Sequence, residues 1–278
     1  CLSRGLGDVY KRQILFISGI KMLGKEDTAV RGNFLSALAM FIAVSVTFIN
    51  VINPILVLVG IGIGAIIGSL IALKVKMTSI PEMVALFNGF GGLATFFIAW
   101  SEFNSIPSNN FQYLLVMITT YIGGVTFSGS VIAYGKLSET LKVEKSSIIT
   151  KLFTTFFYIS IIYLLYSIFI TKIFSPGFDF YTILLILTLL GGVGFVIPIG
   201  GGDMPVVISL LNSFSGIAAA FAGLLLLNNV LIVAGSLVGA SGLILTIIMA
   251  KAMNRSIGNI LFVGYASSAS ASKSEETG

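Results

Sequence analysis

Long apolar runs constrain this chain more than any other feature of its sequence. Several approach 20 residues, and a helix of about 20 apolar residues crosses a bilayer core of roughly 30 Å. Only 10% of the 278 residues are charged, whereas a soluble domain carries about 25%. The mean hydropathy of +1.04 agrees with this contrast. The sequence therefore predicts an all-α fold, a polytopic membrane helix bundle of about nine transmembrane helices.

Breaks rich in Asn, Gly or Pro separate the apolar segments. Pro54 and Pro81 lie where the first turn of a helix tolerates proline. The first segment is too short to span a membrane by itself. The nine expected spans are 14–23, 34–50, 54–73, 81–100, 111–136, 147–173, 180–199, 204–227 and 230–253.

The two ends of the chain differ from its apolar middle. Residues 1–13, CLSRGLGDVYKRQ, are polar, and we expect a non-native scar in place of the start of the first helix, with a short polar tail as the alternative. Residues 14–260 form the expected transmembrane domain. Residues 261–278, with their Ser/Ala-rich end, are expected to be a flexible tail or linker.

Basic residues gather in alternate connections between the spans. Eleven lie in the loops after spans one, three and five and after span nine, and only Lys172 lies in the others. Because basic residues are retained on the cytoplasmic side, this places the C-terminus in the cytoplasm and the N-terminus outside. The eleven are Lys21, Lys25, Arg31, Lys74, Lys76, Lys136, Lys142, Lys145, Lys151, Lys251 and Arg255.

Several kinds of site are excluded by composition. One cysteine, Cys1, and no histidine leave neither an internal disulfide nor a plausible transition-metal site. The net charge of +5 reports membrane topology, so we expect no nucleic-acid partner. The runs 60-GIGIGAIIG-68 and 191-GGVG-194 lie inside spans and lack the strand–loop–helix context of a nucleotide site, so we interpret them as helix-packing glycines.

Four spans carry a stripe of small or polar residues at helical spacing. Close packing with interhelical hydrogen bonds is the simpler interpretation, and the functional one is a narrow hydrated path at the centre of the four helices. The stripes are Ala85, Asn88, Gly92, Thr95 and Ala99; Thr119, Gly123, Thr126, Ser130 and Ala133; Pro205, Ser209, Asn212, Gly216, Ala219 and Gly223; and Gly235, Gly239, Gly242 and Thr246.

Three charged residues lie at span ends on the predicted cytoplasmic side. Glu82 is in a first turn, where the helix dipole favours a carboxylate. Asp203 precedes the eighth span and could cap it through its side chain, and Arg255 follows the ninth. These structural roles are one interpretation, and a shared docking surface is the other.

Four longer motifs carry a family resemblance. The runs 77-MTSIPEMVALFNGFGGLA-94, 125-VTFSGSVIAYGKL-137, 203-DMPVVISLLNSFSGIAAAFAG-223 and 235-GSLVGASGLILTIIMAKAMNRS-256 resemble the membrane domain of the proton-translocating NAD(P) transhydrogenase, β subunit. The resemblance covers roughly residues 14–260. It implies a bacterial inner-membrane location and a part in a Re/Si-specific enzyme that transfers hydride from NADH to NADP⁺ while protons cross the membrane.

The same resemblance implies partners and cofactors outside this chain. NAD(H) would bind to an α subunit that also brings membrane helices. NADP(H) would bind to a C-terminal domain following residue 278. The family also implies a dimer of α/β units. This chain would hold no cofactor and no catalytic residue, and alone it should not transfer hydride.

Family positions fall on individual residues of this sequence. The position matching Asn88 holds a proton-carrying histidine in many relatives, whereas Asn212 and Ser130 match two further polar positions. Thr95 and Thr126 share the stripes of Asn88 and Ser130, and we include them in the expected proton path. Glu82, Asp203 and Arg255 match residues whose implied role is gating between the channel and the NADP(H) domain.

An asparagine cannot take and release a proton near pH 7, so the titrating group must be elsewhere. A partner subunit's membrane helix could supply it, which we favour, or Glu82 or Asp203 could titrate at the mouth of a water path. A small-solute or ion transporter built of packed Gly-rich helices is the alternative function, and a purely structural membrane subunit is a further one. A transporter of this kind often has helices broken near mid-membrane and a repeat between its two halves. Here the glycine breaks lie at span ends, and we see no repeat between the halves.

Overall fold

The computed structural model of the chain describes residues 18–19, 22, 26–49, 54–105, 109–142, 148–170 and 178–261. It divides into two compact units, Cys1–Met77 and Thr78–Gly278, each of which is described by itself. Within the described residues every regular element is a helix. The elements are α2 (Glu26–Ile49), α3 (Pro54–Lys74), η1 (Met77–Ser79), α4 (Ile80–Asn104), α5 (Asn110–Leu137), α6 (Ile148–Ile170), α7 (Phe178–Val196), η2 (Gly201–Asp203), α8 (Met204–Leu225) and α9 (Asn229–Ala252).

Seven helices of the described part are long and apolar enough to cross a membrane. They are α3 to α9, with η1 and η2 continuing into α4 and α8. The predicted all-α membrane bundle is thereby confirmed. The predicted span 34–50 falls within α2 apart from its last residue, and the span 14–23 lies almost wholly outside the described residues.

The glycine run 60–68 lies inside the continuous helix α3 of the Cys1–Met77 unit. Its glycines are therefore not in a loop after a strand, which a dinucleotide site requires. The run 191–194 likewise lies within α7. The interpretation as helix-packing glycines is confirmed for the run 191–194, where Cβ atoms built on Gly191, Gly192 and Gly194 would collide with α5 or α6. It stays a prediction for the run 60–68, whose glycines meet no neighbour among the described residues.

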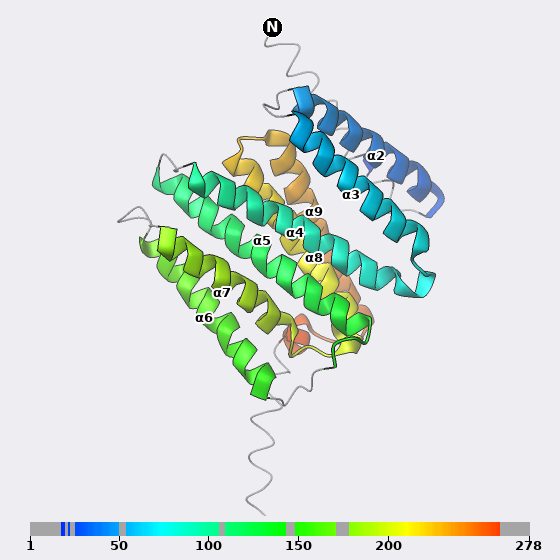
Figure 1. Ribbon diagram of the computed structural model, residues 1–278. Helices are drawn as coiled ribbons and strands as arrows, with labels where there is room; N and C mark the ends of the chain where they lie inside the picture. Colours follow the sequence, from blue (N-terminus) through cyan, green and yellow to red (C-terminus); the bar gives the residue numbers. More distant parts are fainter. Residues whose placement is uncertain are drawn as a thin grey trace, which may run out of the picture. The chain divides into compact units, whose positions relative to one another are not determined.

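The described residues of the Thr78–Gly278 unit contain six long helices, α4 to α9, and α5 is central to them. Three hairpins, α4–α5, α6–α7 and α8–α9, pack through contacts of α5 with α4, α7 and α8, and α4 also contacts α8. Figure 1 shows α5 between α4 and α7. About two thirds of the apolar part of α5 is buried, whereas only a small share of α6 and α9 is buried.

Local sequence explains where these helices begin and end. The side chain of Asn109 accepts a hydrogen bond from the Gln112 amide at 2.9 Å, and Asn228 does the same for Leu231 at 3.1 Å, as N-caps do. Helix α7 ends at Val196, so the predicted end at residue 199 is wrong. Pro198 explains the earlier end, because proline disfavours helical backbone in the residue before it.

Small residues bring helix backbones into close contact at two crossings. A Cβ atom built on Gly92 would lie 2.8 Å from the Gly123 carbonyl oxygen and 2.9 Å from the Phe127 nitrogen. At the other crossing, a Cβ atom on Gly216 would lie 2.9 Å from the Gly239 Cα atom. The glycines of the small-residue stripes predicted on these four helices therefore lie at the α4–α5 and α8–α9 contacts.

Adjacent glycines of α4 offer a matched test of this packing. Gly92→Ala should destabilise the full-length subunit by about 1–3 kcal/mol, because backbone atoms of α5 cannot yield to the added methyl group. Gly91→Ala should be neutral or slightly stabilising, since its Cβ atom would meet only the Ser215 hydroxyl at 3.7 Å. Thermal unfolding in detergent measures both, and equal melting temperatures would contradict the packing described.

Candidate functional site

One buried hydrogen bond joins the two polar stripes of α4 and α5. The Asn88 side-chain amide donates to the Ser130 hydroxyl at 3.0 Å, and the two side chains are 9% and 0% exposed. Gly89 allows this approach, because its added Cβ atom would lie 3.1 Å from the Ser130 Cβ atom. The Asn88 carbonyl oxygen, its second amide hydrogen and the Ser130 proton make no hydrogen bond with the described residues, so the pair offers an acceptor and two donors.

The hydroxyls of Thr95 and Thr126 are engaged within their own helices. Each hydroxyl donates to a carbonyl of its own helix, Thr95 to Gly92 at 2.8 Å and Thr126 to Ile122 at 2.6 Å. Each threonine also lies against the glycine of the other helix. These two residues therefore serve the α4–α5 crossing, which favours the packing interpretation for them.

Asn212 lies on α8 at the level of Asn88 on α4. Helices α4 and α8 contact each other, and a Cβ atom on Gly91 of α4 would lie 3.7 Å from the Ser215 hydroxyl of α8. Asn88 lies three residues before Gly91, and Asn212 lies three residues before Ser215. Asn212 is partly exposed and hydrogen-bonds to no residue that the structure describes. Its amide is therefore available to another group.

The four stripes do not surround one central path, and that expectation is wrong. Helix α9 packs mainly on α8, and its stripe is used in that contact. The Thr246 hydroxyl lies 3.1 Å from the Ser209 hydroxyl, and Ser213 donates to the Gly239 carbonyl at 2.6 Å. Pro205, which the sequence predicts in the α8 stripe, is exposed. The shared region is limited to α4, α5 and α8.

Apolar clusters lie on both sides of the Asn88–Ser130 pair. Helices α4 and α8 begin, and helix α5 stops, at the same side of the unit. We call this side the Asp203 end. Asn88, Ser130 and Asn212 lie about 11–12 Å from it, at 1.5 Å per helical residue. The Asp203-end cluster contains Ala85, Ala133, Val196, Ile199, Met204, Val206, Val207, Ile208, Leu211, Ala250 and Ile260.

The opposite-end cluster contains Ala99, Phe103, Tyr113, Leu115, Val116, Met117, Tyr181, Leu184 and Leu225. The polar residues of α4 and α5 thus form a layer between two apolar regions. In this conformation buried apolar side chains lie towards both ends of the unit from this layer.

An ion pair joins the start of α8 to the end of α9. Arg255 Nη1 lies 3.0 Å from Asp203 Oδ2, with side chains 49% and 12% exposed. The side chain of Asp203 does not cap α8, so that prediction is wrong, because the carboxylate bonds Arg255 instead. Glu82 lies in the first turn of α4 as predicted, at the Asp203 end, and makes no ion pair with a described residue.

The end of α9 aims Arg255 towards Asp203. Asn254 has a left-handed backbone, with φ of 54°. The Arg255 amide bonds the Ala250 carbonyl at 2.9 Å and the Asn254 amide bonds the Lys251 carbonyl at 2.9 Å. This is a Schellman motif, in which asparagine tolerates the left-handed position.

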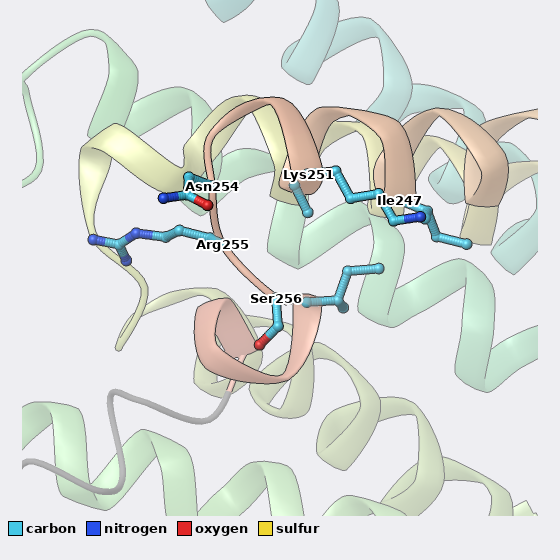
Figure 2. A pocket seen from close by; sticks show the side chains of 7 residues that line it. Ile247, Lys251, Asn254, Arg255 and Ser256 are labelled. Carbon is cyan, nitrogen blue, oxygen red and sulfur yellow. The ribbon is translucent and has the colours of Figure 1, made fainter.

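A surface hollow of about 470 Å³ lies beside Arg255. Figure 2 shows the side chains of Arg255 and Lys251 pointing in opposite directions along it. Two cations that diverge in this way do not converge on one anion. The hollow therefore lacks the arrangement of a phosphate-binding site.

Two polar pairs on the other side of α5 were missed by the sequence interpretation. The Thr120 and Tyr181 hydroxyls lie 2.7 Å apart, and those of Tyr121 and Ser160 lie 3.1 Å apart. They attach α5 to α7 and α6. The sequence hints at these pairs only because Thr120 and Tyr121 directly follow Thr119 of the α5 stripe. That position does not reveal Tyr181 and Ser160 as their partners.

The Asp203–Arg255 pair should contribute little to stability. Half-exposed Arg255 is screened by solvent, so a double-mutant cycle with Asp203→Asn and Arg255→Gln should give a coupling free energy of about 0.2–1 kcal/mol. Urea or thermal unfolding of the four proteins measures it. A coupling above about 3 kcal/mol would instead make the pair a main support of the α8–α9 hairpin.

Comparison with known proteins identifies the family. The family model described as NAD(P) transhydrogenase beta subunit matches residues 9–278. The chain is 36% identical over 265 residues to NAD(P) transhydrogenase subunit beta of Rhodospirillum rubrum, covering 91% of this chain and 56% of that relative. The sequence from a particular strain of that species matches equally. The chain thus spans about half the length of the curated relatives it matches. It is a multi-pass membrane protein, and it belongs to the NAD(P) transhydrogenase beta subunit family.

Proposed function

We propose that this chain is the proton-conducting membrane part of an NAD(P) transhydrogenase and that protons pass the polar layer at Asn88, Ser130 and Asn212. The observation that carries the proposal is the Asn88–Ser130 hydrogen bond, buried between helices of a member of this family. Polar groups inside a membrane bundle are costly, so they commonly mark ion or substrate pathways.

The chemistry of the layer suits water. Asn88 leaves a carbonyl acceptor and Ser130 leaves a hydroxyl donor, and the partly exposed amide of Asn212 brings both kinds of group. Water needs two to four polar partners in such a place. The layer would order a short chain of water molecules, along which a proton can move.

The titrating group of the path lies outside these three residues. Amide and hydroxyl side chains hold water but do not change charge near pH 7. We propose that a membrane helix of a partner subunit supplies the group. Glu82 or Asp203 at the Asp203 end is the second candidate. The first is favoured because Asp203 is already paired with Arg255, and a conducting chain of water gives no site whose occupancy can be sensed.

Proton movement would drive hydride transfer between two nicotinamides of similar potential. One charge moved through the membrane supplies about 2.3 kcal/mol per 100 mV. About 1.4 kcal/mol changes an equilibrium constant tenfold. Each 100 mV could therefore shift the NADPH/NADP⁺ ratio by more than tenfold in a Re/Si-specific enzyme that couples one proton to one hydride.

The Asp203 end is where the channel would meet the NADP(H) domain. Glu82, Asp203 and Arg255 lie at this end, and we assign them to gating and docking. The apolar cluster beneath them is consistent with a conformation closed on that side. We place this end and the C-terminus in the cytoplasm, in the bacterial inner membrane.

The proposed assembly contains other transhydrogenase subunits. NAD(H) would bind to an α subunit that contributes membrane helices, and NADP(H) to a C-terminal domain of the full-length β subunit, in a dimer of α/β units. The small-solute transporter considered from the sequence is not favoured, because the chain belongs to the transhydrogenase family.

Removing the buried amide tests the proposal. Asn88→Leu, reconstituted in the whole complex in vesicles, should lower proton-coupled transhydrogenation at least tenfold, because the donor to Ser130 and the acceptor for water are both lost. Asn212→Leu should have an effect in the same direction.

Asn104→Leu is the matched control, since Asn104 is exposed on the same helix and its amide bonds the Trp100 carbonyl of α4 at 3.0 Å. It should leave coupling unchanged. Full proton coupling in Asn88→Leu and Asn212→Leu would make this chain a structural membrane subunit.

A further inference from the structure

The ammonium group of Lys136 is held by three backbone carbonyls from a segment 60 residues further along the chain. Lys136 lies in the last turn of α5, and its Nζ atom donates to the carbonyl oxygens of Ile199 at 2.6 Å, Val196 at 3.3 Å and Ile197. The side chain is half-buried. It therefore attaches the end of α5 to the end of α7 and the residues after it.

The chemistry of this contact explains why a lysine is present. The last carbonyls of a helix have no partner within the helix and carry the negative end of its dipole. Pro198 has no amide hydrogen, so the chain cannot continue the helix at this point. An ammonium has three donors and a positive charge, so one side chain can bond the carbonyl of Val196, which ends α7, and those of Ile197 and Ile199 just after it.

The segment that Lys136 bonds contributes side chains to the Asp203-end cluster. Val196, Ile197 and Ile199 are 0%, 4% and 3% exposed. Val196 and Ile199 belong to the Asp203-end cluster, together with Ala133 on the helix of Lys136 itself. The position of these carbonyls thus fixes two of the apolar groups between the polar layer and the Asp203 end.

The same segment leads directly to the ion pair. The Asp203 amide donates to the Gly200 carbonyl at 3.0 Å, and Asp203 bonds Arg255. A built Cβ atom meets no neighbour on Gly201 or on Gly202. Gly201 and Gly202 thus have open space on their side-chain face, and the carbonyls bonded by Lys136 lie a few residues before Asp203.

We propose that Lys136 is a positioning residue of the proton path. It fixes residues 196–199, and through them the Asp203-end cluster and the location of Asp203. This inference rests on the proposed function for its effect on proton coupling. The attachment of the segment itself does not depend on that function.

The attachment can be measured without any activity. Ile199→Cys places a thiol on the held segment of the full-length subunit, in a background free of other cysteines and within the assembled complex. With Lys136 present, a membrane-impermeant maleimide should label this thiol slowly. Lys136→Met should raise the labelling rate at least tenfold, and Lys136→Arg, which keeps charge and donors, should raise it less.

Two controls accompany the labelling. Lys151→Met removes an equal charge from the first turn of α6, where the side chain is exposed, and should leave the labelling rate unchanged. Gly201→Cys, at an exposed position with free space around it, should label quickly in every background and reports access of the reagent.

Coupling is the functional measurement. Without the cysteine substitutions, Lys136→Met should lower the number of protons moved per hydride at least threefold in complexes that still melt at the normal temperature, and Lys136→Arg should restore part of it. A residue that only supports the fold would change the melting temperature and the yield of complex, while each folded complex kept its coupling ratio.

Two results would overturn the inference: unchanged labelling in Lys136→Met, or faster labelling with a normal coupling ratio. A different result would show that the proposed function is wrong: Asn88→Leu would retain proton coupling in the same vesicles. In that event the labelling rates still decide whether Lys136 positions the segment.

Discussion

The contact of α4 with α5 at Gly92 and Gly123 is the constraint on which the polar interior depends. Only glycines allow the two backbones to come this close, because a methyl group on either would meet backbone atoms of the other helix within 3.0 Å. Two turns from the Asp203 end, the same contact brings the Asn88 amide to the Ser130 hydroxyl. In lipid an amide without a partner is costly, so packing and polar pairing stabilise each other here.

The arrangement of polar and apolar residues along the helices suggests how conduction could be controlled. A polar layer that opened to both sides at once would leak protons and dissipate the membrane potential. The layer at Asn88 and Ser130 instead has an apolar cluster on each side of it. Movement at the Asp203 end, where the ion pair and the carbonyls bound by Lys136 lie together, would expose the layer on that side without separating α4 from α5.

Sequence alone predicted the helices and the burial of most of the stripe residues, because small and polar residues at helical spacing in an apolar chain favour a face that packs against other helices. It could not predict which stripes meet. Spacing places Thr246 and Ser130 on equivalent faces, yet Thr246 faces α8 and Ser130 faces Asn88. The partner of Asp203 and the carbonyls around Lys136 were also missed, because each depends on the path of a turn rather than on a periodic pattern.

The central claim is that the polar layer of this chain carries protons whose titrating site lies on a partner subunit. The direct test is proton-coupled transhydrogenation by the whole complex in vesicles after every histidine in the partner's membrane helices has been replaced. We predict that coupling is lost and that Asn88→His in this chain restores part of it, since histidine titrates near neutral pH. Full coupling without those histidines would contradict the claim.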